Sequence, residues 1–333
     1  VTPIKEYVCN DTTGKLFVTA KLKNINYSTW APLIALIILV IISAMTSEYF
    51  LRPRNLLNIT RQISYTGTIA LGLTLVIIAG GIDLSVGSMV ALAGGVAILA
   101  LNALGGGVGA VVAAVLVAIA VGMLCGALNG TLVTAGHVAP FIATLGTMSI
   151  FRSMALYIAN GGEFRAQSDL YPNIGAGMTM GIPNSALIFL AIAIIFHILL
   201  TYTPFGRHVC AVGASETVAR YSAIRIQMVK FITYVLTGLT VGISAVLLSS
   251  RLNSISSTNA GVFYELDAIA AVVIGGTSMA GGVGTIWGTV VGAMVLGVIN
   301  NMLNMAGVSP YLQGSVKGIV IIAAVLVQYK RNK

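Results

Sequence analysis

The feature that most constrains the fold of this chain is a series of apolar runs between about Trp30 and Val327, each close to the length of a membrane-spanning helix. A helix needs about 20 mainly apolar residues to cross the hydrocarbon core of a bilayer. Hydrophobic residues make up 57% of the chain and charged residues only 8%, whereas about a quarter of the residues of a soluble domain are charged. The sequence therefore predicts an all-α integral membrane protein.

We expect about ten spans in a single transmembrane domain, residues 29–333, which follows a cytoplasmic tail, residues 1–28. An even number of spans puts both termini on one side, and the excess of Lys and Arg in the tail, in the loop 204–230 and at the C-terminus makes that side the cytoplasm. The net charge of +9 thus reflects basic loops rather than nucleic-acid binding. The expected spans are about Trp30–Met45, Ile63–Ile78, Ser85–Leu104, Val111–Val133, Phe141–Tyr157, Ser185–Tyr202, Phe231–Ser249, Phe263–Ile274, Ile286–Met305 and Tyr311–Val327.

Two glycine-rich stretches, Gly80–Ser85 and Gly275–Gly284, interrupt apolar sequence near membrane depth. Broken helices are tolerated there only where protein covers the backbone or where the backbone lines a wet cavity. We therefore expect polar groups at these breaks and at helix contacts to line a translocation path. The candidates are Asp83, Ser85, Asn129, Thr144, Thr277, Ser278, Asn300 and Asn301.

Several of these polar residues have a structural interpretation as well. Asp83 can cap the helix that begins near Ser85, and bonds between packed helices are the favoured interpretation for Asn129 and its counterpart Asn300. Arg152 is expected to bond to nearby carbonyls rather than to substrate. Glu265 and Asp267 suit a helix N-terminus, and the alternative is that they face an outer vestibule or contact a partner protein.

The chain also contains an internal repeat. Leu128-Asn129-Gly130 and Ala139-Pro140-Phe141 recur as Ile299-Asn300-Asn301 and Ser309-Pro310-Tyr311. The first copy turns inside and the second outside, so the pattern predicts two inverted five-helix repeats, about 29–158 and 185–328, as in transporters. Coincidence between two Gly/Ala-rich helices is the alternative. The residues expected to form close helix-packing faces are Gly122, Gly126, Gly130 and Gly297.

A polar segment, residues 204–230, separates the two apolar halves. Within it, Ala214–Ile226 is predicted to be one short amphipathic helix that starts near Ser215, with Glu216 and Arg220 paired one turn apart. Such a helix would lie on the membrane surface or in the cleft of a partner. The alternative is a solvated loop that only connects two spans.

Four blocks carry a resemblance to a known family: GIDLSVGSMVAL from Gly81, PFIATLGTM from Pro140, FGRHVCAVGASETVARYSAI from Phe205, and YELDAIAAVVIGGTSMAGGVGTIWG from Tyr264. They resemble the permease subunits of bacterial ABC importers for monosaccharides, and ribose permeases most closely. The resemblance runs from about Trp30 to the end of the chain. This sequence departs from the family at Ala214-Ser215, where glycine-asparagine is usual, and at Ala223, where glycine is usual.

The resemblance implies an inner-membrane homodimer with an ATPase of two fused nucleotide-binding domains on its cytoplasmic face and a sugar-binding protein on its outer face. ATP and Mg would bind the ATPase, because this chain has no GxxxxGK[ST] string for a phosphate-binding loop. No metal-ligand pattern is apparent either. The family's coupling segment implies that Gly206, Arg207, Gly213, Glu216, Ala219 and Arg220 contact the ATPase.

Two other classes of function are compatible with a membrane bundle. An ion-coupled carrier would also explain an inverted repeat, and it would need an acidic group at the midplane, for which Asp83 is the one plausible candidate. A membrane enzyme is disfavoured because the spans contain no Ser/His/Asp set, paired carboxylates or metal-spaced ligands.

Overall fold

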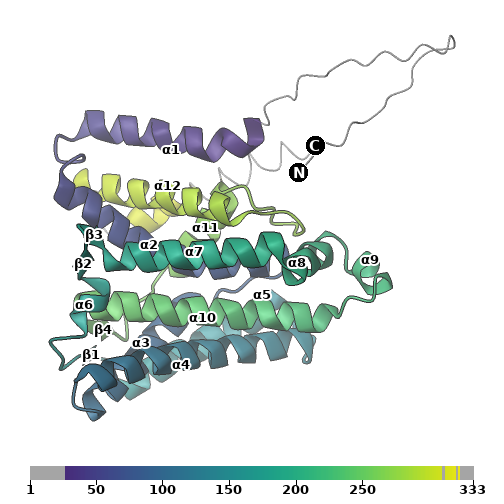
Figure 1. The fold of residues 1–333 in the computed structure, drawn as a ribbon, viewed down its shortest axis with the longest axis horizontal. Coiled ribbons are helices and arrows are strands. Elements are labelled where there is room, and N and C mark those ends of the chain that lie inside the picture. The colour runs from purple at the N-terminus through teal and green to yellow at the C-terminus, as the bar shows by residue number, and fades with distance from the viewer. Residues whose placement is uncertain (1–26, 310–311, 320–321, 323–333) are drawn as a thin grey trace, which may run out of the picture.

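The computed structural model describes residues 27–309, 312–319 and 322. Its helices lie side by side, most of them along the longest dimension of the molecule (Figure 1). Their bounds are α1 Tyr27–Thr46, α2 Pro53–Ile78, α3 Val86–Ala103, α4 Val108–Thr134, α5 Pro140–Ile158, α6 Pro172–Gly175, α7 Asn184–Tyr202, α8 Pro204–Ala214, α9 Glu216–Tyr221, α10 Ile226–Leu252, α11 Tyr264–Ile274 and α12 Ile286–Met305.

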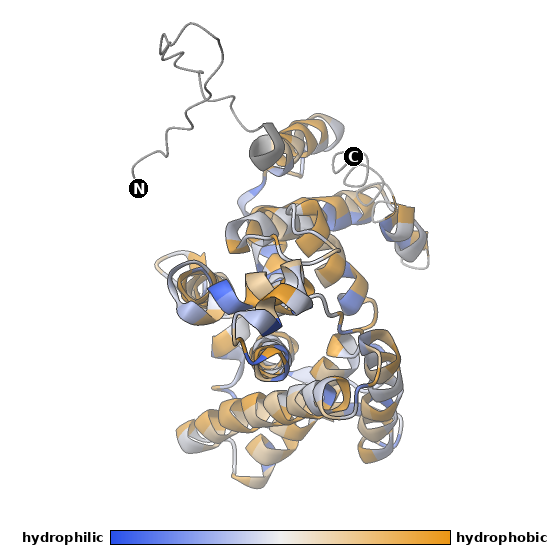
Figure 2. Ribbon diagram, turned by 90° about the vertical axis from the view of Figure 1, so that its right-hand side faces the viewer, coloured by the Kyte–Doolittle hydropathy of each residue, from blue (hydrophilic) through white to orange (hydrophobic). Residues whose placement is uncertain are grey.

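The two ends of the bundle differ in structure. At one end, β1 (Glu163–Arg165) pairs antiparallel with β4 (Ser254–Ser256), and β2 (Met178–Thr179) pairs antiparallel with β3 (Ile182–Pro183). Helix α6 lies at this end too, whereas α8 and α9 project at the opposite end (Figure 1). Figure 2 looks onto the α8–α9 end, where hydrophilic residues gather in front of mainly hydrophobic helices.

Seven described helices, α2, α3, α4, α5, α7, α10 and α12, are long and apolar enough to cross a membrane. Helix α1 contributes the shorter apolar run Ala31–Thr46, and α11 has only 11 residues. Residues 1–26 of the expected tail and about half of the expected tenth span lie outside the described residues, although 312–319 is helical. Helix α2 begins at Pro53 rather than Ile63, because the helix continues through a polar turn that the apolar run does not include and has Pro at its first turn.

Both predicted helix breaks are present. Residues 79–85 between α2 and α3 and residues 275–285 between α11 and α12 are not helical. Glycines supply the left-handed backbone that such breaks need: φ is 80° at Gly80, 89° at Gly276, 87° at Gly281 and 78° at Gly282.

The predicted glycine packing face is confirmed between α4 and α10. A Cβ atom on Gly122 would lie 2.2 Å from the Gly238 carbonyl oxygen, and one on Gly126 would lie 2.3 Å from the Tyr234 carbonyl oxygen. A Cβ on Gly130 would lie 2.9 Å from the Phe231 ring. The two helices therefore pack backbone against backbone, as small residues allow inside a membrane.

Gly297 on α12 is a packing position against a different helix. A Cβ there would lie 2.3 Å from Ile63 Cγ1 on α2. Thus α4 packs along α10, whereas α12, which carries the second copy of the repeated sequence, packs on α2.

Candidate functional site

A fully buried polar cluster joins the first helix break to α4. The Asp83 carboxylate accepts hydrogen bonds from the Ser85 backbone N–H at 2.9 Å and from Ser85 Oγ at 2.7 Å. Asn129 Nδ2 donates to the two Asp83 oxygens, at 3.3 and 3.2 Å, and to Ser85 Oγ at 2.8 Å. Asp83 therefore holds the turn that precedes α3, and Asn129 of α4 bonds to the first helix break rather than to a second helix. A buried carboxylate needs such donors to offset its desolvation.

Helix α10 closes this cluster from another side. The Tyr234 hydroxyl donates to the Ile82 carbonyl oxygen at 3.0 Å. Asn129 Oδ1 is buried and has no hydrogen-bond partner among the residues that the structure describes. One acceptor of the cluster is therefore buried without a donor in the described part of the chain.

The other candidates for a translocation path do not converge on this cluster. Thr144 Oγ1 bonds to the Pro140 carbonyl within α5, and Asn301 exchanges side-chain bonds with Asn55 of α2 at 2.8 and 3.0 Å. Asn300 is buried on α12. Thr277 and Ser278 lie in the second break, where the Ser278 hydroxyl accepts a bond from the Ala280 N–H at 3.2 Å.

Charged residues gather around the first turn of α11. Glu265 lies against Gly87 at the start of α3, since a Cβ on Gly87 would be 2.5 Å from Glu265 Oε2. Asp267 is 5% exposed, and its Oδ2 accepts a bond from Lys317 Nζ at 2.8 Å. Both acids therefore occupy a helix N-terminus as predicted, and Lys317 has the internal partner that a cation in an expected span requires.

Arg152 also behaves as expected from the sequence. Its Nη1 donates to the Ser257 carbonyl oxygen at 2.9 Å and to the Thr258 carbonyl oxygen at 3.4 Å. The side chain therefore ties α5 to the segment that leads into α11.

We expect Asp267→Leu to lower the free energy of unfolding by about 3–5 kcal/mol, because it leaves the Lys317 charge buried without a partner. The double variant Asp267→Leu, Lys317→Met removes both charges and should recover most of that loss. Thermal unfolding of the purified protein in detergent measures both effects. A double variant no more stable than the single one would show that the pair is not the cause.

Within Ala214–Ile226 the structure has one short helix, α9, which begins after Ser215 as predicted but ends at Tyr221 rather than at Ile226. The residues before it form a separate helix, α8, which the sequence analysis did not predict. Ser215, with φ −165° and ψ 113°, interrupts the helix because its side chain caps α9, accepting from the Val218 N–H at 3.3 Å. The predicted pairing of Glu216 with Arg220 is also replaced: Glu216 pairs with Lys230 of α10. This ion pair ties the start of α9 to the start of α10.

The six expected coupling residues divide into two groups. Gly206 and Ala219 are buried, and Gly213 packs against α2, so these three hold the segment to the bundle. The three charged residues, Arg207, Glu216 and Arg220, are exposed.

Helix α9 exposes two apolar residues that were not among the predicted site residues. Val218 is 62% exposed and Tyr221 is 88% exposed. Their three-residue spacing on a short helix was the signal in the sequence. Beside them is a hollow of about 330 Å³ lined by Arg220, Ile224, Arg225, Ile226 and Gln227. An exposed aromatic next to a basic hollow is typical of a docking surface for another protein.

Ala223, where the resembled family has glycine, has φ 57°. A residue with a Cβ pays about 1–2 kcal/mol in this left-handed region. We therefore expect Ala223→Gly to raise the free energy of unfolding by about 1 kcal/mol, after the greater chain entropy of glycine is allowed for. Ala211→Gly inside α8 should act in the opposite direction, and thermal unfolding compares the two. Equal destabilisation by both would contradict this account of Ala223.

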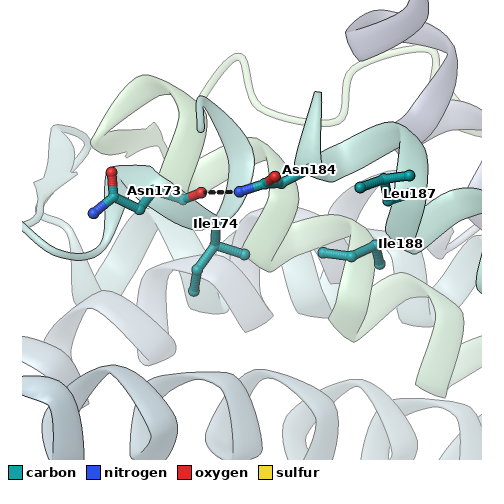
Figure 3. A pocket seen from close by; sticks show the side chains of 5 residues that line it. All are labelled: Asn173, Ile174, Asn184, Leu187 and Ile188. Atoms are coloured by element: carbon teal, nitrogen blue, oxygen red, sulfur yellow. Dashed lines mark hydrogen bonds between the residues drawn. The ribbon is translucent and has the colours of Figure 1, made fainter. Parts of the chain in front are cut away.

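A second hollow, of about 400 Å³, lies at the opposite end between α6 and the start of α7. Figure 3 shows Ile174, Leu187 and Ile188 on its wall, with Asn184 Nδ2 donating to the Asn173 carbonyl oxygen at 2.8 Å. Because the wall is mainly apolar and the Asn184 amide is already bonded, this hollow is poorly suited to a hydroxyl-rich ligand.

Comparison with known proteins decides the family. A family model described as "Branched-chain amino acid transport system / permease component" matches residues 55–325. The chain belongs to this family. The permease is thus a multi-pass membrane protein, in agreement with its seven long apolar helices.

The permease is also similar to curated relatives over nearly its whole length. It is 46% identical over 303 residues to the ribose import permease protein of Bacillus subtilis strain 168, covering 90% of this chain and 92% of that relative. It is 43% identical to the ribose import permease protein of Escherichia coli strain K12, covering 90% and 93%. The L-arabinose transport system permease protein of the same organism is 33% identical, with 92% of each chain covered. No solved structure matches the chain.

Proposed function

We propose that this permease is the membrane subunit of an ATP-driven ABC importer and that it forms the path for a monosaccharide, with ribose as the leading substrate. The observation that carries the proposal is the 43–46% identity to two ribose import permeases over 90% of the chain. The identity to the arabinose permease is lower, at 33%, which favours ribose over arabinose.

The proposed architecture is about ten spans in two inverted repeats. Two corresponding contacts between the halves support it. Helix α4 of the first half packs on α10 of the second, and α12 of the second half packs on α2 of the first. The short helix α11 is then the counterpart of α3, and their N-termini meet inside the bundle: a Cβ on Gly87 would lie 2.1 Å from the Gly261 carbonyl oxygen. Interrupted helices whose ends lie inside the bundle are typical of transporter folds.

The proposed partners bind at opposite ends. An ATPase with two fused nucleotide-binding domains, which would bind ATP and Mg itself, docks on α8 and α9. That end is then cytoplasmic, together with both termini. A sugar-binding protein delivers substrate at the end that holds α6 and the small sheets, and a second copy of the permease completes the path. The exposed Val218 and Tyr221 beside the basic hollow support the ATPase surface.

The chain itself performs no covalent step in this proposal. A neutral sugar needs hydrogen bonds to its hydroxyl groups, and a path that releases it must bind it weakly. Asp83 and Ser85 already bond to one another and to Asn129, so we infer that they hold the first break in place. Asn129 Oδ1, which is buried and has no donor among the described residues, is the candidate acceptor for a substrate hydroxyl. Thr144, Thr277, Ser278, Asn300 and Asn301 remain candidates for the rest of the path.

Uptake of labelled ribose into proteoliposomes that hold the complete importer tests the substrate. Unlabelled ribose in excess should abolish the signal, and arabinose should reduce it less. Arabinose that competes better than ribose would overturn the ribose assignment.

A further inference from the structure

Three segments that are far apart in the sequence meet at one backbone junction: the end of α2, the last turn of α8 and the loop 275–285. The Gly282 N–H donates to the Ile78 carbonyl oxygen at 2.9 Å. A Cβ on Gly213 would lie 1.7 Å from that same oxygen and 2.6 Å from the Gly282 nitrogen. No side chain fits between these backbones, so the three segments touch directly.

The loop side of this junction depends on glycine. Gly281 and Gly282 have φ of 87° and 78°, in the left-handed region that favours glycine. A Cβ on Gly281 would lie 2.8 Å from the Gly213 carbonyl oxygen, and one on Gly282 would lie 2.9 Å from Ala214 Cα. Ile78 is the last residue of α2, where carbonyls lack donors within the helix. The Gly282 N–H supplies that missing donor, which fixes the loop to α2.

The junction stands between the proposed docking surface and both helix breaks. The first break begins directly after Ile78 and contains Asp83. The second break holds Thr277 and Ser278, and the Ser278 N–H bonds across it to the Val283 carbonyl oxygen at 2.9 Å. On its other side, Gly213 lies one residue before the end of α8, which leads into α9 through Ser215.

We propose that this junction is the rigid link that carries a displacement of α8 and α9 to both breaks at once, with Gly213 as a positioning residue. This inference rests on the proposed function. Flexible side chains can change rotamer under load, whereas close-packed backbone transmits displacement with little loss. One movement of α8 would therefore shift the end of α2 and the loop 275–285 together.

The first test compares Gly213→Ala with Gly109→Ala, because Gly109 lies in the first turn of α4 with no atom within 4 Å of a new Cβ. In the reconstituted importer, Gly213→Ala should still bind the ATPase and hydrolyse ATP, while ribose uptake per ATP falls by about tenfold. Gly109→Ala should match wild type. A purely structural role would lower uptake and hydrolysis together with the amount of folded complex. An unchanged ratio of imported sugar to hydrolysed ATP in the Gly213→Ala importer would overturn the link. Absence of uptake by the wild-type importer in the same preparation would instead overturn the proposed function.

The second test needs no substitution. Hydrogen exchange of the Gly282 amide reports its bond to Ile78. A rigid link predicts that this amide stays protected in the wild-type importer, both without nucleotide and with ATP bound. Loss of protection on ATP binding would show that the junction opens during the cycle, and the proposal would be wrong.

Discussion

Replacing both Tyr221 and Val218 with alanine is expected to detach the ATPase from this permease. The two side chains are 88% and 62% exposed on α9 and lie beside the basic hollow. Truncation of an aromatic anchor such as Tyr221 at the centre of an interface costs about 2 kcal/mol or more, so the dissociation constant should rise at least about 30-fold. Binding of the ATPase to the permease in nanodiscs measures the change.

The control for this prediction is Tyr157→Ala at the end of α5. Tyr157 is 84% exposed, like Tyr221, but it lies far from α9. It should leave binding of the ATPase unchanged. Equal affinity of the double variant and the control would place the docking surface elsewhere on the permease.

Gly238→Val is expected to prevent the permease from folding to a stable bundle. The Cβ alone would lie 2.1 Å from the Gly122 carbonyl oxygen and 2.8 Å from the Gly122 carbonyl carbon. Both atoms belong to the backbone of α4, so the helices must separate along their length. Overpacking of a tight core costs about 1–3 kcal/mol and sometimes more, and we expect this site at or above the upper end of that range because no flexible side chain can give way.

Gly109→Val is the matched control, since it adds the same side chain to α4 where no atom lies within 4 Å. The yield of monodisperse protein after extraction, together with its melting temperature, compares the two variants. Gly109→Val should behave like wild type. A Gly238→Val protein with wild-type yield and melting temperature would contradict the glycine contact between α4 and α10.

Hydrophobic runs and glycine spacing predicted much of the fold. They located α3, α4, α5, α7 and α12 within a few residues, both breaks, and the glycine face of α4, because each of these depends on local pattern. The partner of that face was not predictable, since the contact with α10 joins residues more than a hundred positions apart. Helix ends were less well predicted where helices run on into polar sequence, as α2 does.

The polar segment shows where local reasoning fails. Glu216 and Arg220 have the spacing of a helical ion pair, but Lys230 from α10 lies close enough to take Glu216 instead. Ser215 was expected near the helix start, and its role as a cap was predictable. The end of α8 at the same residue was not predictable, because Phe205 to Ile224 contains no proline to mark the break.

The same limit applies to the candidate path. Asp83, Ser85 and Asn129 were each singled out by their place in apolar sequence, but only the fold brings them into one cluster. Asn301 was selected on the same grounds, and it pairs with Asn55 instead. A polar residue at a helix contact indicates a buried hydrogen bond, but only the fold shows which residue is its partner and therefore which elements the bond joins.

The most direct test of the central claim is ribose uptake into proteoliposomes that hold this permease, with the ATPase and the sugar-binding protein added or omitted, under ATP or under an ion gradient. We predict uptake only when all three components and ATP are present. Uptake by the permease alone under an ion gradient would contradict the importer and make Asp83 the first residue to test as a coupling group.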